Sequence, residues 1–190
     1  LLSNDGALTD SDTVAITVNA VNDAPVNTVS GAVSGDEDTA ISIATNSIAD
    51  VDDTSLTAVT ISSTQSGTFS LVGVVGLTFA AGDGTADNTM TFSGTIANIN
   101  TAIATLTWTS ATDEDTDAVL TILSNDGDDT DSDTVAITVN SVNDPPVNTV
   151  SGAVSGGEDT AISIGTNSIS DADSTSLTAV TISSTQSGTF

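Results

Sequence analysis

The sequence predicts an all-β protein made of tandem antiparallel β-sandwich domains, with one short helix in each repeat. Two observations lead to this prediction. Apolar and polar residues alternate over short runs that end in Gly, Asn or Asp, as in half-buried strands. Segment 2–69 also recurs as segment 123–190, with 59 of 68 paired positions identical, which gives a repeat of 121 residues. A unit of that length is large enough to fold as a domain.

The repeat divides the chain into three units. We expect residues 23–143 to form one complete repeat, residues 1–22 to be the C-terminal part of a preceding repeat, and residues 144–190 to be the N-terminal part of a following one. Phe190 is then expected to lie within a strand. Both boundaries fall in Val-Asn-Asp-x-Pro segments, and the residue before a proline is held extended, so these segments predict short, stiff linkers.

Five strands are predicted within the complete repeat from alternation and from β-branched residues: Leu56–Ser62, Thr89–Phe92, Leu106–Thr109, Val119–Leu123 and Thr134–Val139. The last of these places Val135, Ile137 and Val139 on one face. The same pattern predicts a strand near the N-terminus, with Val14, Ile16 and Val18 on one face.

One stretch departs from the period of two. Apolar residues recur at helical spacing from Ile96 to Leu106, which predicts a short helix over Thr95–Ala104 with Thr95 as its N-cap. Trp108 shares a strand face with Leu106 and is expected in the core. A sugar-binding aromatic platform is therefore not favoured, because the chain has no other Trp and no Tyr.

The charge is entirely of one sign. The chain has 26 acidic side chains and no Lys, Arg or His, for a formal net charge of −26, and it has no Cys. Nucleic acid is excluded as a partner because no side chain can neutralise phosphates. Catalysis by His, Lys or Cys is excluded as well. Asp83 and Asp87 could be imagined as a glycosidase pair, but a solvated turn is the simpler interpretation, and we predict no enzyme activity. No apolar run is long enough to insert in a membrane.

The acidic residues gather in turns and beside the linkers. Asp and Asn are common in turns because they bond nearby backbone, and an acidic surface could also reflect a high-salt habitat. Neither explanation accounts for clustering at the linkers without any positive counter-charge. Short Asp side chains in loops suit hard divalent cations, which take oxygen ligands. The sequence therefore favours cation binding.

Several motifs in a fixed order resemble those of a known family. Ser124–Gly127 precedes the segment Asp133-Thr-Val-Ala-Ile-Thr-Val-Asn-Ser-Val-Asn-Asp-Pro-Pro146, and Leu77-Thr-Phe-Ala-Ala-Gly-Asp-Gly-Thr85 precedes Thr89–Phe92. The whole 121-residue unit resembles the tandem cadherin-like repeats of large bacterial surface and RTX-type adhesins. This resemblance implies immunoglobulin-like or cadherin-like sandwiches, an extracellular location on the bacterial surface, and neighbouring repeats of the same chain as partners.

The resemblance also implies Ca²⁺ between consecutive domains. At the C-terminal junction of the complete repeat it implies the ligands Glu37, Asp113, Asp115, Asn143, Asp144, Asp171 and Asp173. At the N-terminal junction it implies Asn22, Asp23, Asp50, Asp52 and Asp126. The expected function is a Ca²⁺-rigidified stalk or spacer of an adhesin. The alternative is a building block of a self-assembling extracellular filament or sheath, with other copies of the chain as partners.

Overall fold

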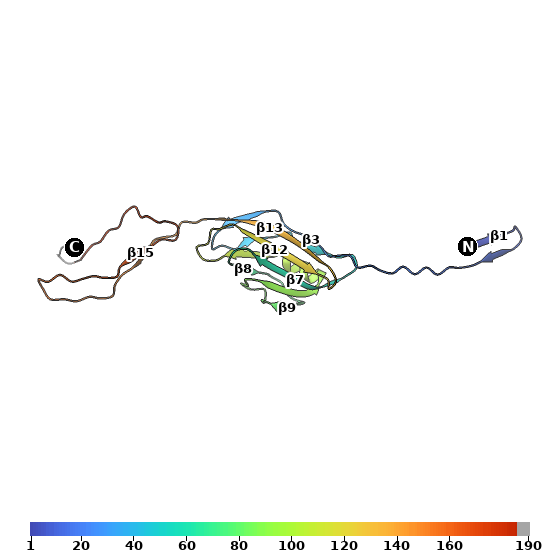
Figure 1. Cartoon of the computed structure of the whole chain (residues 1–190), viewed down its shortest axis with the longest axis horizontal. Coiled ribbons are helices and arrows are strands. Elements are labelled where there is room, and N and C mark those ends of the chain that lie inside the picture. The colour runs from blue at the N-terminus through green and yellow to red at the C-terminus, as the bar shows by residue number, and fades with distance from the viewer. Residues whose placement is uncertain (186–190) are drawn as a thin grey trace.

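The computed structural model describes residues 1–185, so the strand expected at Phe190 lies outside the described residues. Figure 1 shows a central folded body with an extended segment leaving each of its two ends. The N-terminal segment contains β1 (Leu2–Asn4) and β2 (Thr9–Ser11), and the C-terminal segment contains β14 (Val147–Thr149) and β15 (Ser168–Ser170). No helix in residues 1–185 has the length and apolar character needed to cross a membrane.

The central body is an all-β sandwich, which confirms the predicted fold class. Its larger sheet has the strand order β4-β13-β12-β7-β10-β9, formed by Val33–Asp36, Thr130–Asn140, Ala118–Asn125, Ser55–Ser63, Met90–Thr95 and Leu77–Ala81. The smaller sheet has the order β5-β11-β8, formed by Ile41–Ser42, Thr107–Ser110 and Gly67–Ser70. A third, two-stranded sheet pairs β3 (Val26–Thr28) with β6 (Ser47–Ala49).

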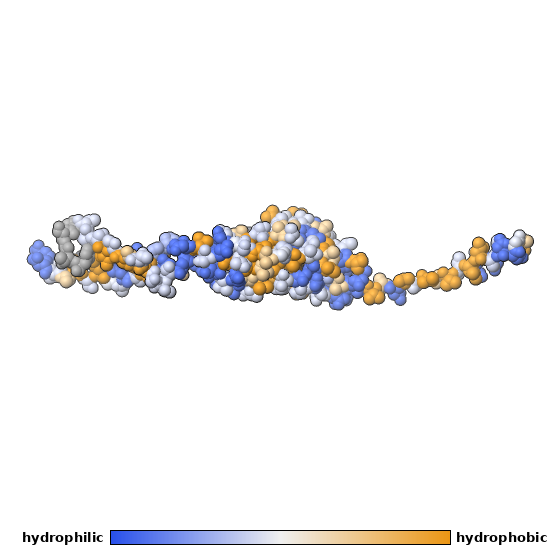
Figure 2. Space-filling view, turned by 90° about the horizontal axis from the view of Figure 1, so that it is seen from above, coloured by the Kyte–Doolittle hydropathy of each residue, from blue (hydrophilic) through white to orange (hydrophobic). Residues whose placement is uncertain are grey.

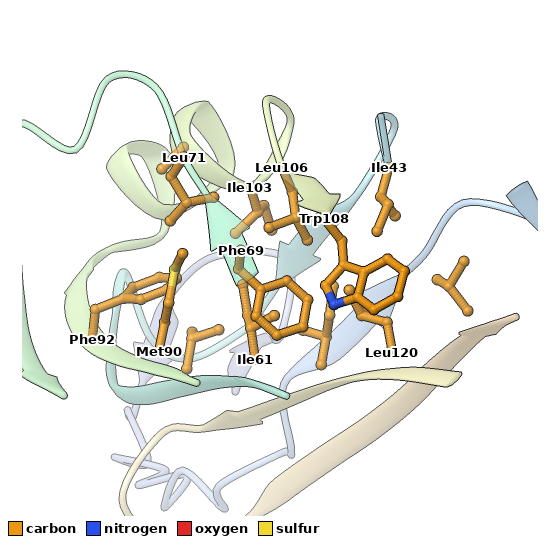
Figure 3. Close-up of a cluster of buried hydrophobic side chains, with 14 of the residues drawn as sticks. Ile43, Ile61, Phe69, Leu71, Met90, Phe92, Ile103, Leu106, Trp108 and Leu120 are labelled. Atoms are coloured by element: carbon orange, nitrogen blue, oxygen red, sulfur yellow. The ribbon is translucent and has the colours of Figure 1, made fainter. Parts of the chain in front are cut away.

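The core lies between the two main sheets. Trp108 and Phe69 from the smaller sheet point toward Ile61 and Leu120 from the larger one (Figure 3). Trp108 is fully buried, as the sequence predicts, so its ring is not available to a ligand at the surface. All three predicted inward residues of β13 (Val135, Ile137 and Val139) are buried as well.

The predicted helix is confirmed with its cap. Helix α1 spans Ile96–Ile103, and Thr95 Oγ1 accepts a hydrogen bond from the Asn98 backbone N–H at 3.3 Å. Ile99 and Ile103 are buried on the side of α1 that faces the core. Asn100 fastens the helix to β6, because its side chain accepts from Ile48 N at 2.7 Å and donates to Ile48 O at 2.9 Å.

One pairing departs from the antiparallel prediction. Strand β4 runs parallel to β13, with Val33 opposite Ile137 and Asp36 opposite Asn140. The chain needs the whole body of the domain, from β5 to β12, to connect these two strands, as a parallel pair requires a long crossover. As a result, the residues that follow β4 lie beside the chain as it leaves β13.

The strand predicted around Val14, Ile16 and Val18 does not form, and all three side chains are exposed. Strands β1 and β2 do pair in the register of their copies in β12 and β13, with Leu2 opposite Ser11 just as Leu123 is opposite Ser132. The residues that cover Val135, Ile137 and Val139 in the complete repeat have no counterparts in residues 1–22. Without those apolar neighbours, the alternating Val and Ile side chains of this segment have nothing to pack against, so the alternation does not stabilise a strand.

Candidate metal centre

Acidic groups gather at both ends of the central body. On the side shown in Figure 2, strongly hydrophilic residues are concentrated toward these ends. Within residues 1–185, three trios of carboxylates have oxygen atoms within 4.8 Å of one another: Glu37 with Asp144 and Asp173, Asp38 with Asp113 and Asp144, and Asp50 with Asp53 and Asp126. The first two share Asp144, and we call their five residues the C-terminal cluster. The third trio is the N-terminal cluster.

Strand β13 sets the separation of the two clusters. The turn that contains Asp126 joins β12 to the start of β13, whereas Glu37 follows β4 beside the end of β13. Because β13 is 11 residues long, its two ends lie about 33 Å apart. Each cluster therefore belongs to one end of the domain, where a linker enters or leaves.

Glu37 is the buried member of the C-terminal cluster, with 3% of its surface exposed. Its backbone N–H donates to Asn140 O at 3.0 Å, which continues the β4–β13 pairing by one residue. Its side-chain Oε1 accepts from the backbone N–H of Val142 at 2.6 Å. Glu37 thus holds the first residues of the linker against the domain.

Asp38 and Asp113 both adopt left-handed backbone conformations, each with φ of 57°. Asp tolerates this region better than most residues, because its short side chain can bond locally. Ser110, at the end of β11, accepts a hydrogen bond from Asp38 N at 3.1 Å. The two turns are therefore held together, and their carboxylates approach Asp144.

Asp144 and Asp173 come from the linker and from the segment beyond it. The backbone N–H of Asp144 donates to Asp173 Oδ2. Asp171 turns this loop, because its Oδ1 accepts from Asp173 N at 3.1 Å and from Ser174 N at 2.8 Å. Partial burial raises the pKa of the Asp144 carboxyl, and the charges of Asp113, Asp173 and Asp38 raise this pKa further.

The N-terminal cluster is built on two tight turns. Asp50 Oδ1 accepts from Asp52 N at 2.9 Å and from Asp53 N at 2.8 Å. Its other oxygen, Oδ2, is buried and has no hydrogen-bond partner among the described residues. Asp126 Oδ1 accepts the backbone N–H groups of residues 128 and 129, both at 2.7 Å.

The N-terminal linker contacts this cluster. Asn22 Nδ2 donates to Asp126 Oδ2 at 3.0 Å, and Asp23 N donates to Asp52 Oδ2 at 2.8 Å. The pKa of Asp126 is lowered by hydrogen bonds from the backbone of Asp129, then from Asn22, then from the backbone of Asp128. These donors favour the charged carboxylate.

The structure thus places the residues proposed from the sequence in three groups. Six lie in the carboxylate trios: Glu37, Asp50, Asp113, Asp126, Asp144 and Asp173. Four support them through the hydrogen bonds given above: Asn22, Asp23, Asp52 and Asp171. The remaining two, Asp115 and Asn143, are exposed and belong to no trio in residues 1–185.

Two members of the trios were missed, Asp38 and Asp53. Each lies in an acidic run that the sequence does reveal, residues 35–39 and 50–53. Which acid of a run turns toward the others depends on backbone conformation, as the positive φ of Asp38 shows. Asp is one of the residues that tolerate a left-handed turn, and this preference is the sequence signal that could have identified Asp38.

The pair Asp83 and Asp87 shapes its own loop. Asp87 Oδ2 accepts from Asp83 N at 2.9 Å and from Gly84 N at 2.8 Å. Gly84 has φ of 92°, a conformation that suits glycine. These bonds agree with the turn interpretation of the two acids.

The fold and the clusters define an all-β sandwich domain within a tandem-repeat chain, with acidic groups at both ends of the domain. No protein-family model, curated protein or solved structure matches the chain. Its function is therefore inferred from the fold, the clusters and the sequence motifs.

Proposed function

We propose that this chain is a Ca²⁺-rigidified repeat module, part of an extended stalk or spacer in a secreted or surface-attached bacterial adhesin. The observation that carries the proposal is the burial of the Glu37 carboxylate beside Asp144 and Asp173, in a chain that has no basic side chain. The motif order described above supports the adhesin class and the cadherin-like type of sandwich.

The electrostatics of Glu37 favour a bound cation. A buried carboxylate is stable only when it is paired, hydrogen-bonded or protonated, and within residues 1–185 the backbone N–H of Val142 is the one donor to Glu37. Carboxylates about 4 Å apart repel by about 1 kcal/mol in water and by more when they are partly buried. A divalent cation supplies the positive charge that reverses the sign of this interaction.

The donor set fits Ca²⁺. Ca²⁺ takes six to eight oxygen ligands from carboxylates, carbonyls and water, and a trio of carboxylates offers up to six oxygens. In the C-terminal cluster, Glu37, Asp38 and Asp113 belong to the complete repeat, while Asp144 and Asp173 belong to the linker and the next unit. At the other end, Asp50, Asp53 and Asp126 would hold the ion, and Asp50 Oδ2 is already free of hydrogen bonds in the described residues.

A cation in the C-terminal cluster would fix the orientation of neighbouring units. Glu37 and Asp113 move with the sandwich, whereas Asp173 moves with the following segment. When the sandwich and the following segment both supply ligands to one ion, the flexible linker between them becomes rigid. When the ion is removed, repulsion among the same carboxylates should loosen the junction.

Small-angle X-ray scattering of the chain, in Ca²⁺ and in chelator, tests this proposal. The chain in Ca²⁺ is expected to have a narrower distance distribution and a longer, better-defined maximum dimension. The double variant Asp144→Asn, Asp173→Asn should behave in Ca²⁺ as the unmodified chain does in chelator. The variant Asp10→Asn, Asp12→Asn is the matched control, because it removes the same charge far from both clusters and should respond to Ca²⁺ normally.

Calorimetric titration with Ca²⁺ provides the direct measure of binding. The absence of any heat of binding, or a distance distribution that Ca²⁺ does not change, would contradict the proposal. The extracellular location is tested separately by labelling intact source cells with an antibody against residues 23–143. Labelling only after permeabilisation would argue against a surface adhesin.

A further inference from the structure

The four central strands of the larger sheet (β13, β12, β7 and β10) carry no charge on their outer face, although the chain as a whole is strongly acidic and the edge strand β4 carries Asp36 on that side. Strand alternation gives this face the outward residues of β7, β10, β12 and β13, which we call the neutral sheet face: Thr60, Ser62, Thr91, Ser93, Val119, Thr121, Leu123, Ser132, Thr134 and Ala136. Residues 23–143, all described by the structure, contain 18 acidic side chains, and none belongs to this set.

The acidic residues of β13 are kept off the neutral sheet face because successive side chains of a strand point to opposite sides of the sheet. Asp131 and Asp133 lie on the same side of the strand as Val135, away from the neutral face. Asp131 Oδ2 accepts the backbone N–H of Asn27 at 2.7 Å, so this carboxylate is directed toward β3. The remaining acids of the repeat are in turns, linkers and the end of β4.

On the neutral sheet face, hydroxyl side chains of neighbouring strands lie opposite one another, with Val119 and Leu123 as the two large apolar side chains among them. Thr121 lies between Ser62 and Thr134 on the neighbouring strands. Leu123 lies between Thr60 and Ser132 in the next row, and Thr60 Oγ1 is 3.1 Å from Thr91 Oγ1.

Val119 and Leu123 are partly open to solvent, with 39% and 38% of their surfaces exposed. Helix α1 and the smaller sheet contribute to the core on the opposite side of the larger sheet. The described residues therefore leave this face uncovered.

We infer that the neutral sheet face is a contact surface between copies of this chain. All side-chain charges in the chain are negative, so copies that meet through turns or linkers bring carboxylates together, and each close pair opposes association. Two neutral sheet faces meet without that repulsion and bury the Val119 and Leu123 side chains of both copies.

The geometry favours a symmetric and weak contact. A face that meets itself about a two-fold axis makes an isologous pair. Four strands spaced about 4.8 Å apart give a patch smaller than a standard stable interface, so the affinity of a single pair is low. Salt should strengthen the contact, because it screens the repulsion between the net charges of the two copies.

Cross-linking tests this inference without involving the clusters, since the chain has no Cys. The variant Thr121→Cys places one thiol in the neutral sheet face, and Val75→Cys places one in an exposed loop outside it. In high salt with EDTA, a flexible bis-maleimide should join copies of Thr121→Cys at least about tenfold faster, because association raises the local thiol concentration. Prior reaction with a monofunctional maleimide gives the accessibility of each thiol for normalisation.

Charge introduced on the face completes the test. Leu123→Asp or Thr134→Asp, each added to Thr121→Cys, should reduce the rate to that of Val75→Cys while the thermal melt stays cooperative. Two alternative outcomes would overturn the inference: equal normalised rates for the two single-Cys variants, or no effect of either added Asp. EDTA removes Ca²⁺, so a negative cross-linking result does not contradict the proposed Ca²⁺-dependent junction. Likewise, a lack of Ca²⁺ binding at the junction does not contradict the contact between neutral sheet faces.

Discussion

Ser124 donates a hydrogen bond to Asn27 Oδ1 at 2.8 Å, although 97 residues separate the two in sequence. Asn27 is 7% exposed, and its Nδ2 donates to Ile122 O at 3.3 Å and to Asp131 O at 3.0 Å. One side chain thus fastens β3 to both strands of the β12–β13 hairpin. Since β3 begins directly after the N-terminal linker, the linker ends on an anchored strand.

Replacement of Asn27 by Ala should lower the free energy of unfolding by about 2–3 kcal/mol, because buried partners lose their hydrogen bonds. Urea denaturation followed by far-UV circular dichroism measures the change. Asn148→Ala is the matched control, since Asn148 is the copy of Asn27 in the C-terminal unit and is exposed. Equal effects of the two variants would contradict the anchoring role.

Glu37→Gln should reduce the thermal stabilisation that Ca²⁺ provides. Gln keeps an oxygen that can accept from Val142 N, so the variant should remain folded in EDTA, where loss of a buried negative charge costs no stability. Differential scanning calorimetry with Ca²⁺ and with EDTA makes the comparison. Glu158→Gln changes the exposed copy of the same residue and should keep the full Ca²⁺ response. A full response in Glu37→Gln as well would remove Glu37 from the site.

Asp126 and Asp144, the cluster carboxyls with shifted pKa values, should give pH effects of opposite sign in EDTA. The pKa of Asp126 is lowered in the folded state from its usual 3.8. Its contribution to stability is therefore present above the unfolded-state pKa and is lost as the pH falls through the folded-state pKa. Melting temperatures measured across the acid range should fall less steeply for Asp126→Asn than for the unmodified chain. An unchanged slope would mean that the backbone donors to Asp126 add no stability.

The pKa of Asp144 is raised instead, so its favourable contribution is present at low pH and is lost as the pH rises through the folded-state value. At neutral pH in EDTA, Asp144→Asn should therefore make the C-terminal junction more ordered. Amide hydrogen exchange of residues 141–147 measures that order. In Ca²⁺ the same variant should make the junction less ordered, and the same direction of change in both conditions would contradict the proposed role.

Trp108→Ala should lower the free energy of unfolding by about 3–5 kcal/mol, as expected for truncation of a fully buried aromatic residue. Trp108→Phe should cost less than the lost ring volume alone predicts, because Nε1 is a buried donor without a partner in the described residues. Chemical denaturation followed by circular dichroism compares both variants, since no other Trp can report fluorescence. A loss for Trp108→Phe that exceeds the value expected from the missing ring volume would show that Nε1 has a partner.

The parts of the fold that follow from local sequence were predictable. Thr95 and the spacing of Ile99 and Ile103 identify α1, and alternation identifies the inward face of β13. Long-range pairing was not predictable in this way, since nothing near Val33 indicates that it lies parallel to Ile137. The strand prediction around Val14 was wrong for a related reason: alternating apolar residues stabilise a strand only where other apolar residues cover them.

The candidate site was likewise predictable in its local features and not in its long-range contacts. The sequence locates the acidic runs, because Asp in turns beside Pro-containing linkers is a local pattern. The trios depend on which side chains meet after folding. Asp38 rather than Asp115 joins Asp113 because of its left-handed turn and its hydrogen bond to Ser110.

The parallel pairing of β4 with β13 has a mechanical consequence. Tension along a tandem chain pulls β13 outward through the C-terminal linker, while β3, and β4 behind it, are held from the other end. The four opposed positions from Val33–Ile137 to Asp36–Asn140 then lie along the direction of the pull. Their hydrogen bonds are loaded together in shear, and they do not open one after another as in a peeled hairpin. Each domain of such a chain resists stretching along the axis on which its neighbours pull.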